Sequence, residues 1–155
     1  MDFQPAPAAK GKLITVVQGD YAISKDPGTT PSTVLGSCIS VCLYDPKNKV
    51  GGMNRFLLAT DRGESCENIR YGSHALELLI DELMKSGGHR SNFQAKVFGG
   101  ARMSGSFGDI GGANAIFARE FLAREGIACL SESVGGLRLD DFNLLPQRVQ
   151  HARCW

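Results

Sequence analysis

The chain has 155 residues, of which 43% are hydrophobic and 21% charged, a composition that predicts one globular domain and excludes a disordered chain. The formal net charge is +1, with 17 basic against 16 acidic side chains, which argues against nucleic acid or an anionic membrane surface as the partner. No segment has the roughly 18 consecutive apolar residues of a membrane span, and the N-terminus lacks the apolar core of a secretory signal, so we expect a cytoplasmic protein without membrane insertion.

The five cysteines are spread through the chain without a Cys-x-x-Cys pair. Cys38 and Cys42 are four residues apart, which in a strand separates them by about 13 Å, too far to bind one metal ion. We therefore expect reduced thiols, with no disulfide framework, metal site or cofactor. The glycine-rich residues 104–112 lack the Lys and Ser/Thr of a Walker motif and the GxGxxG spacing, which argues against nucleotide binding.

The N-terminal third is predicted to hold short strands and turns. Residues 1–10, rich in alanine and proline, are expected to form a flexible tail, and residues 11–155 a single domain. Strands are predicted over residues 13–17 and 21–23. Residues 26–31, with the sequence DPGTTP, predict a turn that leads into the next segment.

Residues 34–58, VLGSCISVCLYDPKNKVGGMNRFLL, are predicted to form a Gly-Ser-Cys turn followed by a β-hairpin. Residues 45–48 supply the turn of the hairpin, and the glycine pair 51–52 in the returning strand indicates a bulge or a close backbone approach. Cys38 lies where the chain enters the first strand. A thiol beside a glycine at a strand end, with backbone N–H groups nearby to polarise a carbonyl, is a candidate nucleophile. The first strand alternates between two faces, with Ile39, Val41 and Leu43 on one and Ser40, Cys42 and Tyr44 on the other.

The second half of the chain is predicted to carry two amphipathic helices. After a polar loop over residues 59–71, a helix begins at an N-cap Ser73 and ends at the glycines 87–88. Its apolar stripe consists of Leu76, Leu79, Ile80, Leu83 and Met84. A strand over residues 94–98 precedes a second helix over 115–124, which ends at Gly126, and strands are predicted over 127–130 and 137–145. The inward face of the second helix is predicted to carry Ile116, Phe117 and Phe121. Together these elements predict an α+β fold of mixed, short-stranded β-sheets packed with two main helices.

Several spaced motifs in one order resemble CheD-type chemoreceptor glutamine deamidases. They are LGSCISVCLYDP, GGMN-x-FLL, RYG, AKVFGGA-x-M, IG-x-x-N and a late GG, and they extend from about Gly19 to Gly136. The resemblance implies a cysteine hydrolase fold related to the cytotoxic necrotising factor toxins. It implies hydrolysis of receptor glutamine side chains to glutamate with release of ammonia, in bacterial chemotaxis signal transduction. The implied partners are methyl-accepting chemotaxis receptors and a CheC-type phosphatase.

The resemblance also assigns roles to residues. The nucleophile is Cys38, and Ser32, with Thr33 beside it, takes the place of the family's threonine six residues before the cysteine. The family's catalytic histidine is replaced by Arg55. A guanidinium cannot accept the thiol proton, but a nearby cation favours the thiolate. The residues implied in substrate binding are Gly36, Ser37, Asn54, Phe98, Gly99 and Gly100.

Three points stay open at the level of sequence. His74, at the start of the first predicted helix, is a candidate substitute base. The FGGARM segment, residues 98–103, is interpreted either as a turn that needs glycine backbone angles or as part of the substrate site. Arg55 also leaves two hypotheses for function: an active glutamine deamidase, or a weakened relative that only docks on chemoreceptors or on a CheC-type phosphatase.

Overall fold

The computed structural model describes residues 12–26, 28–34, 38–58, 66–100, 110–134 and 149–150. Its N-terminal strands are β1 (Lys12–Thr15), β2 (Tyr21–Ser24), β3 (Thr29–Val34), β4 (Ile39–Asp45) and β5 (Val50–Asn54). They are followed by α1 (Cys66–Lys85), the 3-10 turn η1 (Arg90–Asn92), β6 (Gln94–Gly99), α2 (Ile110–Arg124), β7 (Ala128–Val134) and β8 (Val149–Gln150).

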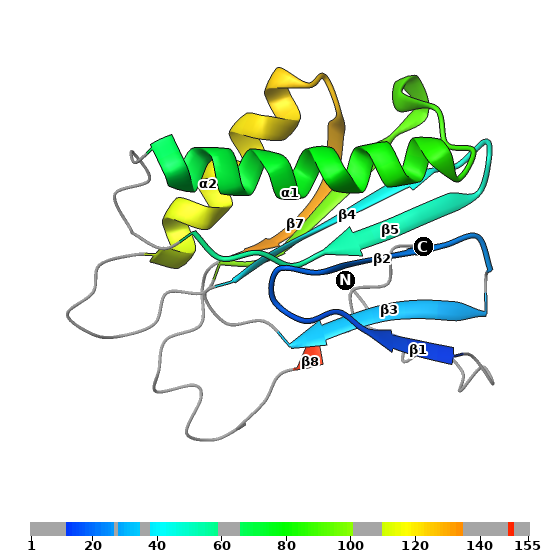
Figure 1. The fold of residues 1–155 in the computed structure, drawn as a ribbon, viewed down its shortest axis with the longest axis horizontal. Coiled ribbons are helices and arrows are strands. Elements are labelled where there is room, and N and C mark those ends of the chain that lie inside the picture. Colours follow the sequence, from blue (N-terminus) through cyan, green and yellow to red (C-terminus); the bar gives the residue numbers. More distant parts are fainter. Residues whose placement is uncertain are drawn as a thin grey trace.

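The strands form two sheets, and the larger carries the candidate nucleophile at one end. Its order is β2-β5-β4-β6-β7, in which β6 and β7 are parallel and the other pairs antiparallel. The smaller sheet has the order β1-β3-β8, with β1 and β3 parallel. Figure 1 shows the smaller sheet along the lower edge of the molecule and α1 crossing in front of the larger one. The predicted α+β class with mixed pairing is confirmed.

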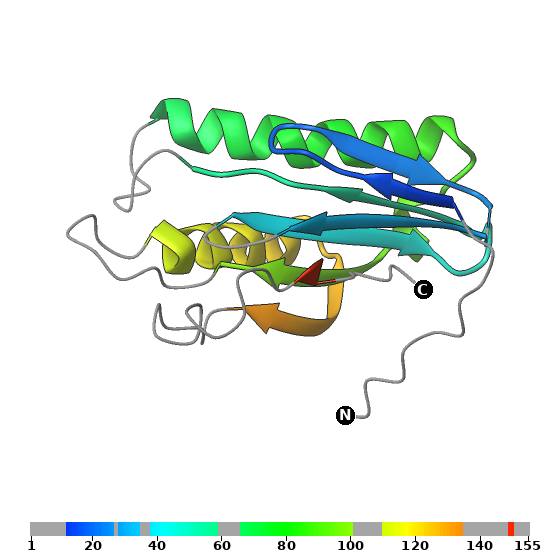
Figure 2. The same cartoon turned by 90° about the horizontal axis from the view of Figure 1, so that it is seen from below.

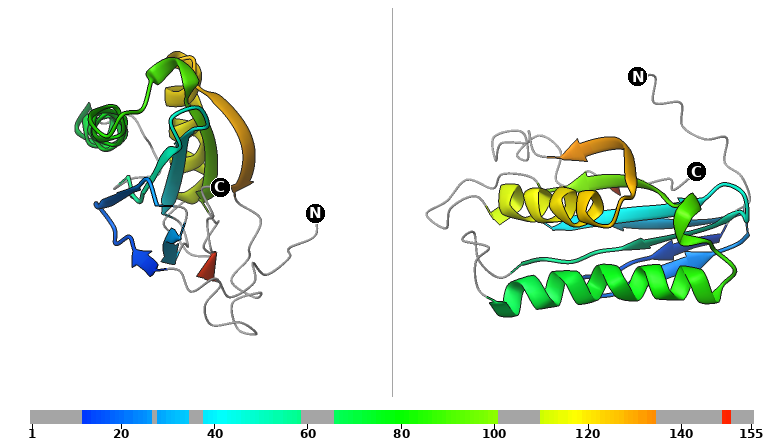
Figure 3. Two further views of the ribbon diagram at one scale, coloured as in Figure 1. Left: turned by 90° about the vertical axis from the view of Figure 1, so that its right-hand side faces the viewer. Right: turned by 90° about the horizontal axis from the view of Figure 1, so that it is seen from above.

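The main core lies between one face of the larger sheet and the two helices. Ile39, Val41 and Leu43 of β4 point into it, and α1 and α2 cover it. The long axis of α1 runs alongside the strands (Figure 2). Seen end-on, α1 lies on the opposite side of the molecule from the edge strand β7 (Figure 3). The residues that the helices contribute to this core are Leu76, Leu79, Ile80, Leu83, Ala115, Ala118, Phe121 and Leu122.

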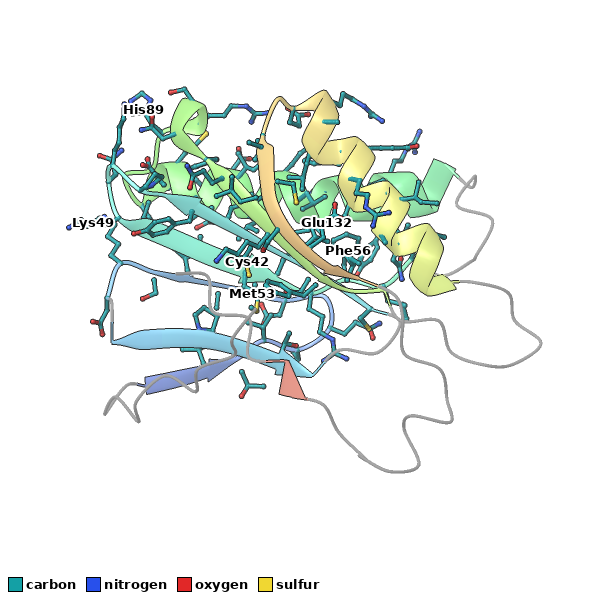
Figure 4. All side chains as sticks on the ribbon, turned by 180° about the vertical axis from the view of Figure 1, so that it is seen from behind. Cys42, Lys49, Met53, Phe56, His89 and Glu132 are labelled. Carbon is teal, nitrogen blue, oxygen red and sulfur yellow. The ribbon has the colours of Figure 1, made fainter. Side chains whose placement is uncertain are left out.

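A second, smaller core lies on the other face of the same sheet. It consists of the buried residues Val16, Ala22, Cys42 and Met53, with Ile14 of β1 packed against them. Figure 4 shows Cys42 and Met53 on the side of the larger sheet that looks toward β3. The alternation predicted for β4 is therefore real, but both of its faces are covered, which makes this strand the centre of the fold.

Both helices begin earlier than predicted. Helix α1 starts at Cys66, so residues 66–71, predicted as loop, are helical, and Ser73 lies inside the helix. Gly72, a poor helix former, is retained there because an added Cβ would lie 2.6 Å from the Phe117 ring. Helix α2 starts at Ile110, five residues before the predicted start. Packing between the two helices thus accounts for Gly72 inside α1.

The structure corrects the predictions for two side chains and for three strands. Met84 and Ile116, predicted to face the core, are 45% and 53% exposed. Residues 29–34 form strand β3, although the threonines and proline of residues 29–31 indicate a continuing turn in the sequence. The turn ends at Gly28, whose N–H donates to the Asp26 carboxylate, and Pro31 lies in the part of β3 that β8 does not pair with. The strand predicted over 50–58 ends at Asn54, and the one predicted over 127–130 extends to Val134.

The predicted helix ends are confirmed. Gly87 adopts φ +101° and the Gly88 N–H donates to the Leu83 carbonyl at 2.8 Å, closing α1. Gly126 adopts φ +69° and the Ile127 N–H donates to the Leu122 carbonyl at 2.9 Å, closing α2. The glycines of 104–109 and the strand predicted over 137–145 lie outside the described residues.

Candidate active site

The hairpin that presents Cys38 is anchored at its far end by Asp45. The Asp45 carboxylate accepts hydrogen bonds from the Lys47 N–H at 2.9 Å, the Asn48 N–H at 3.0 Å, the Asn48 side-chain amide at 2.7 Å and the His89 N–H at 2.8 Å. Burial alone raises the pKa of Asp45, but the hydrogen bonds from Asn48, His89 and Lys47 outweigh it and hold this pKa well below its usual range. Asp45 is therefore a buried carboxylate that fixes the β4–β5 turn.

The backbone at Cys38 is held by residues that follow β5 and β6. Its carbonyl accepts a hydrogen bond from the Gly100 N–H at 2.8 Å. The next residue, Ile39, exchanges two backbone hydrogen bonds of 2.9 Å with Phe56. The nucleophile candidate thus sits on a fixed backbone at the start of the central strand.

Gly99 and Gly100 are required by backbone geometry beside Cys38. They adopt φ +96° and +63°, and a Cβ added at Gly99 would lie 2.2 Å from the Cys38 carbonyl oxygen. The turn interpretation of this segment is confirmed for these two residues. Because the Gly100 N–H already donates to Cys38, it is not a free donor for an oxyanion in this conformation. The expected contact of Phe98, Gly99 and Gly100 with substrate stays a prediction.

The sulfur of Cys38 is enclosed by polar groups. The residue is only 6% exposed, and its sulfur lies 3.7 Å from Nη2 of Arg55 and 3.7 Å from Oε1 of Gln18. A guanidinium is the kind of neighbour that stabilises a thiolate. Arg55 itself is half-buried, and its Nε finds no hydrogen-bond partner in the described part of the chain. The thiol is buried, as expected for a structural cysteine, but its polar neighbours are those of a reactive one.

A turn over residues 17–20 brings Gln18 to the thiol. The Asp20 N–H donates to the Val17 carbonyl at 3.0 Å, and Gly19 adopts φ +84°. The backbone of Arg55 anchors this turn: its carbonyl accepts from the Gly19 N–H at 2.8 Å and its N–H donates to Asp20 at 3.2 Å. Sequence analysis missed Gln18, because no local pattern places a turn residue against a cysteine 20 positions later.

Asn54 joins the hairpin to α1. Its Oδ1 accepts from the Val41 N–H at 3.1 Å, its Nδ2 donates to the Ala75 carbonyl at 3.4 Å, and its own carbonyl accepts from the Ser40 hydroxyl at 2.6 Å. The side-chain amide therefore replaces a backbone acceptor where β4 and β5 separate, next to Arg55. This buried amide has its partners inside the protein, and its expected contact with substrate stays a prediction.

Comparison with known proteins places this arrangement in a family. The family model described as CheD chemotactic sensory transduction matches residues 57–147. A probable chemoreceptor glutamine deamidase CheD of Cereibacter sphaeroides is 47% identical over 148 residues, covering 94% of this chain and 74% of the relative. The chain belongs to the CheD family. A probable chemoreceptor glutamine deamidase CheD 1 of a Ruegeria species is 56% identical over 123 residues, covering 79% of this chain and 66% of that relative.

A solved structure supports the fold of this CheD-family chain. A crystal structure of a Neisseria meningitidis protein of the DUF152 family aligns with a TM-score of 0.53 at 11% identity, covering 83% of this chain and 64% of that one. At this level of sequence identity, the alignment supports a shared fold and nothing about function. The α+β fold is therefore shared with a solved protein of distant sequence.

In this CheD-family chain, Ser32 and its neighbour Thr33 carry the hydroxyls expected near the thiol, and the structure describes only the side chain of Thr33. Ser32 lies in β3, where its backbone pairs with Thr15, and its side chain lies outside the described residues. The neighbouring Thr33 is buried, and its hydroxyl donates to the Val16 carbonyl at 2.7 Å. Gly36 and Ser37 also lie outside the described residues. The roles expected for Ser32, Gly36 and Ser37 stay predictions.

No histidine among the described residues makes a hydrogen bond with the Cys38 sulfur. His89 donates its N–H to Asp45, at the opposite end of β4, and Figure 4 shows it far from Phe56, the partner of Ile39. His74 is exposed on α1, and His151 lies outside the described residues. Arg55 is thus the described cation beside the thiol, and it has no lone pair to accept a proton.

The described residues contain no group of three or more His, Cys, Asp or Glu side chains that would hold a metal ion. Cys38, Cys42 and Cys129 do not take part in disulfides. None of the described helices is long and apolar enough to cross a membrane.

Proposed function

We propose that this chain is a chemoreceptor glutamine deamidase, acting in the cytoplasm on the side-chain amides of receptor glutamines. The proposal rests on the family and on the names of relatives whose alignments, covering up to 94% of the chain, include Cys38. The observation that carries it is the contact between the Cys38 sulfur and a guanidinium at 3.7 Å. A cation at this distance supports a thiolate, the form of cysteine that attacks a carbonyl.

In the proposed reaction, the Cys38 thiolate attacks the carboxamide carbon of a glutamine and forms a carbon–sulfur bond. The carbon–nitrogen bond then breaks, and the nitrogen leaves as ammonia after taking a proton. Water hydrolyses the thioester, which gives glutamate and restores the thiol. Arg55 acts by stabilising the thiolate, and the proton for ammonia comes from water, because a guanidinium stays protonated throughout.

The absence of an imidazole at position 55 sets the expected rate. General acid–base assistance is typically worth about 10² to 10⁴ in rate. We therefore expect the wild-type protein to deamidate slowly, and the Arg55→His variant to be faster by at least about 10².

The test uses a purified receptor cytoplasmic fragment and follows the mass change from glutamine to glutamate by peptide mass spectrometry. Wild-type protein, Arg55→His and Cys38→Ala are compared at equal concentration. Conversion by wild type that disappears in Cys38→Ala supports the proposal. Conversion that survives in Cys38→Ala would remove Cys38 from the mechanism, and conversion by Arg55→His alone would show that the natural chain is not an enzyme.

Two observations favour a second candidate function. Arg55 stands in the place of the catalytic histidine that the family resemblance implies, and the Cys38 side chain is buried. A protein with these features would act by binding a chemoreceptor or a CheC-type phosphatase without chemistry. Affinity measurements of the Cys38→Ala variant against both proteins test this candidate, and no binding to either would eliminate it.

A further inference from the structure

Gln18 presents to the thiol the same chemical group as the proposed substrate. Its side chain ends in a primary carboxamide, and the oxygen of that carboxamide lies 3.7 Å from the Cys38 sulfur. The sulfur is therefore in contact both with an amide of the protein itself and with Arg55.

The fold does not depend on this contact. Gln18 is an exposed residue of the 17–20 turn, and the turn is held by the backbone groups of Val17, Gly19, Asp20 and Arg55. Within the described residues, the hydrogen bond of the Gln18 side chain is the one with the sulfur. Because the turn is anchored by its backbone, the side chain of Gln18 is able to leave the thiol while the turn stays in place.

A second observation concerns the guanidinium beside the thiol. Among the residues that the structure describes, the buried Nε of Arg55 has no hydrogen-bond partner, although its guanidinium contacts the sulfur through Nη2. Buried donors in proteins are nearly always paired. The carbonyl oxygen of an amide bound at the thiol is an acceptor of the kind that this N–H lacks.

We propose that Gln18 is an internal stand-in for the substrate: its carboxamide occupies the place beside Cys38 that a receptor glutamine takes, so that substrate enters by displacing it. This inference rests on the proposed function for the identity of the substrate. It assigns position 18 to the carboxamide subsite, where it competes with the incoming glutamine. An internal competitor lowers the apparent affinity by the fraction of time that the subsite is occupied.

The thiol test uses iodoacetamide, a small electrophile that itself carries a primary carboxamide. Alkylation of Cys38 is measured by peptide mass spectrometry relative to Cys129, an exposed thiol that serves as an internal reference. Gln18→Ala is expected to raise the ratio of the Cys38 to the Cys129 alkylation rate by about 5- to 10-fold. The substitution removes one hydrogen bond to the sulfur and the side chain that shields it. Gln18→Leu, which keeps the bulk without the carboxamide, is expected to raise it as well.

A ratio unchanged in Gln18→Ala overturns the inference. A ratio in Gln18→Leu equal to that in wild type also overturns the inference, because the bulk of the side chain, and not its carboxamide, would then shield Cys38 from alkylation. The unfolding midpoints of both variants are measured alongside, and values equal to wild type show that the changed reactivity is local.

Deamidation of the receptor fragment separates this inference from the proposed function. The inference predicts a lower KM for Gln18→Ala than for wild type, by the same factor as the change in alkylation. If Gln18→Ala deamidates the fragment with the wild-type KM and the wild-type rate of alkylation, the proposed function is supported and the role of Gln18 is refuted. The other outcome is faster alkylation of Cys38 in Gln18→Ala while neither wild type nor Gln18→Ala deamidates the fragment. That result would refute the proposed function and support Gln18 as the occupant of the subsite.

Discussion

Replacing Gly99 by alanine tests how closely the backbone of β6 approaches the nucleophile. Gly99 adopts φ +96°, and an added Cβ would lie 2.2 Å from the Cys38 carbonyl oxygen. A non-glycine residue in the left-handed region costs about 1–2 kcal/mol. Relief of the overlap requires the Cys38 carbonyl to move, which weakens its hydrogen bond from Gly100 and adds about 1–3 kcal/mol for the polar groups left unpaired. We expect the free energy of unfolding to fall by about 2–5 kcal/mol.

Gly126→Ala provides the matched control. Gly126 also has a positive φ, +69°, but a Cβ added there meets no atom within 4 Å. This variant should therefore lose only the backbone contribution of about 1–2 kcal/mol. Urea unfolding of both variants gives the comparison, with the slope m checked so that a change in the midpoint reports stability. Equal losses in the two variants would refute the close approach at Cys38.

The remaining predictions concern residues away from the thiol. Because hydrogen bonds hold the pKa of Asp45 below its unfolded value near 3.9, its stabilising contribution is full above about pH 4 and is lost as the pH falls through the folded pKa. Thermal unfolding from pH 7 to 2.5 should show a steeper loss for wild type than for Asp45→Asn, and parallel curves would contradict this. Gly72→Ala should cost about 1–3 kcal/mol in urea unfolding, because its Cβ overlaps the Phe117 ring, and an unchanged midpoint would exclude that overlap. Arg119→Ala removes an exposed ion pair with Glu132 and should cost less than about 1 kcal/mol, so a larger loss would indicate a packing role.

The sequence was most informative where structure is decided by neighbouring residues. The β4–β5 hairpin follows from the alternation of residues 39–44 and from the Asp45 turn, and both are local patterns. The ends of α1 and α2 follow from Gly87 and Gly126, whose positive φ angles are the usual signature of a helix end. Cys38 was found as a candidate for the same reason, because a thiol at a strand entry is visible in a short motif.

The features that sequence analysis missed depend on contacts between distant residues. The first two turns of α1 have no apolar periodicity, and Gly72 is explained only by the Phe117 ring of α2. Ile116 was assigned to the core from its spacing, although the face of α2 that meets the sheet carries Ala115 and Ala118. Gln18 reaches Cys38 through a turn anchored on Arg55, which no pattern within one segment reveals.

Strand β4 separates two tasks along its length. The residue before it presents the thiol, whereas Asp45 at its other end ties together the hairpin turn and the segment after α1. Seven residues of an extended strand put roughly 20 Å between these ends. Substitutions meant to raise thermal stability can therefore be placed at the Asp45 end, where they leave the thiol untouched. Conversely, substitutions at the thiol end can remove activity without lowering the stability that the Asp45 end provides.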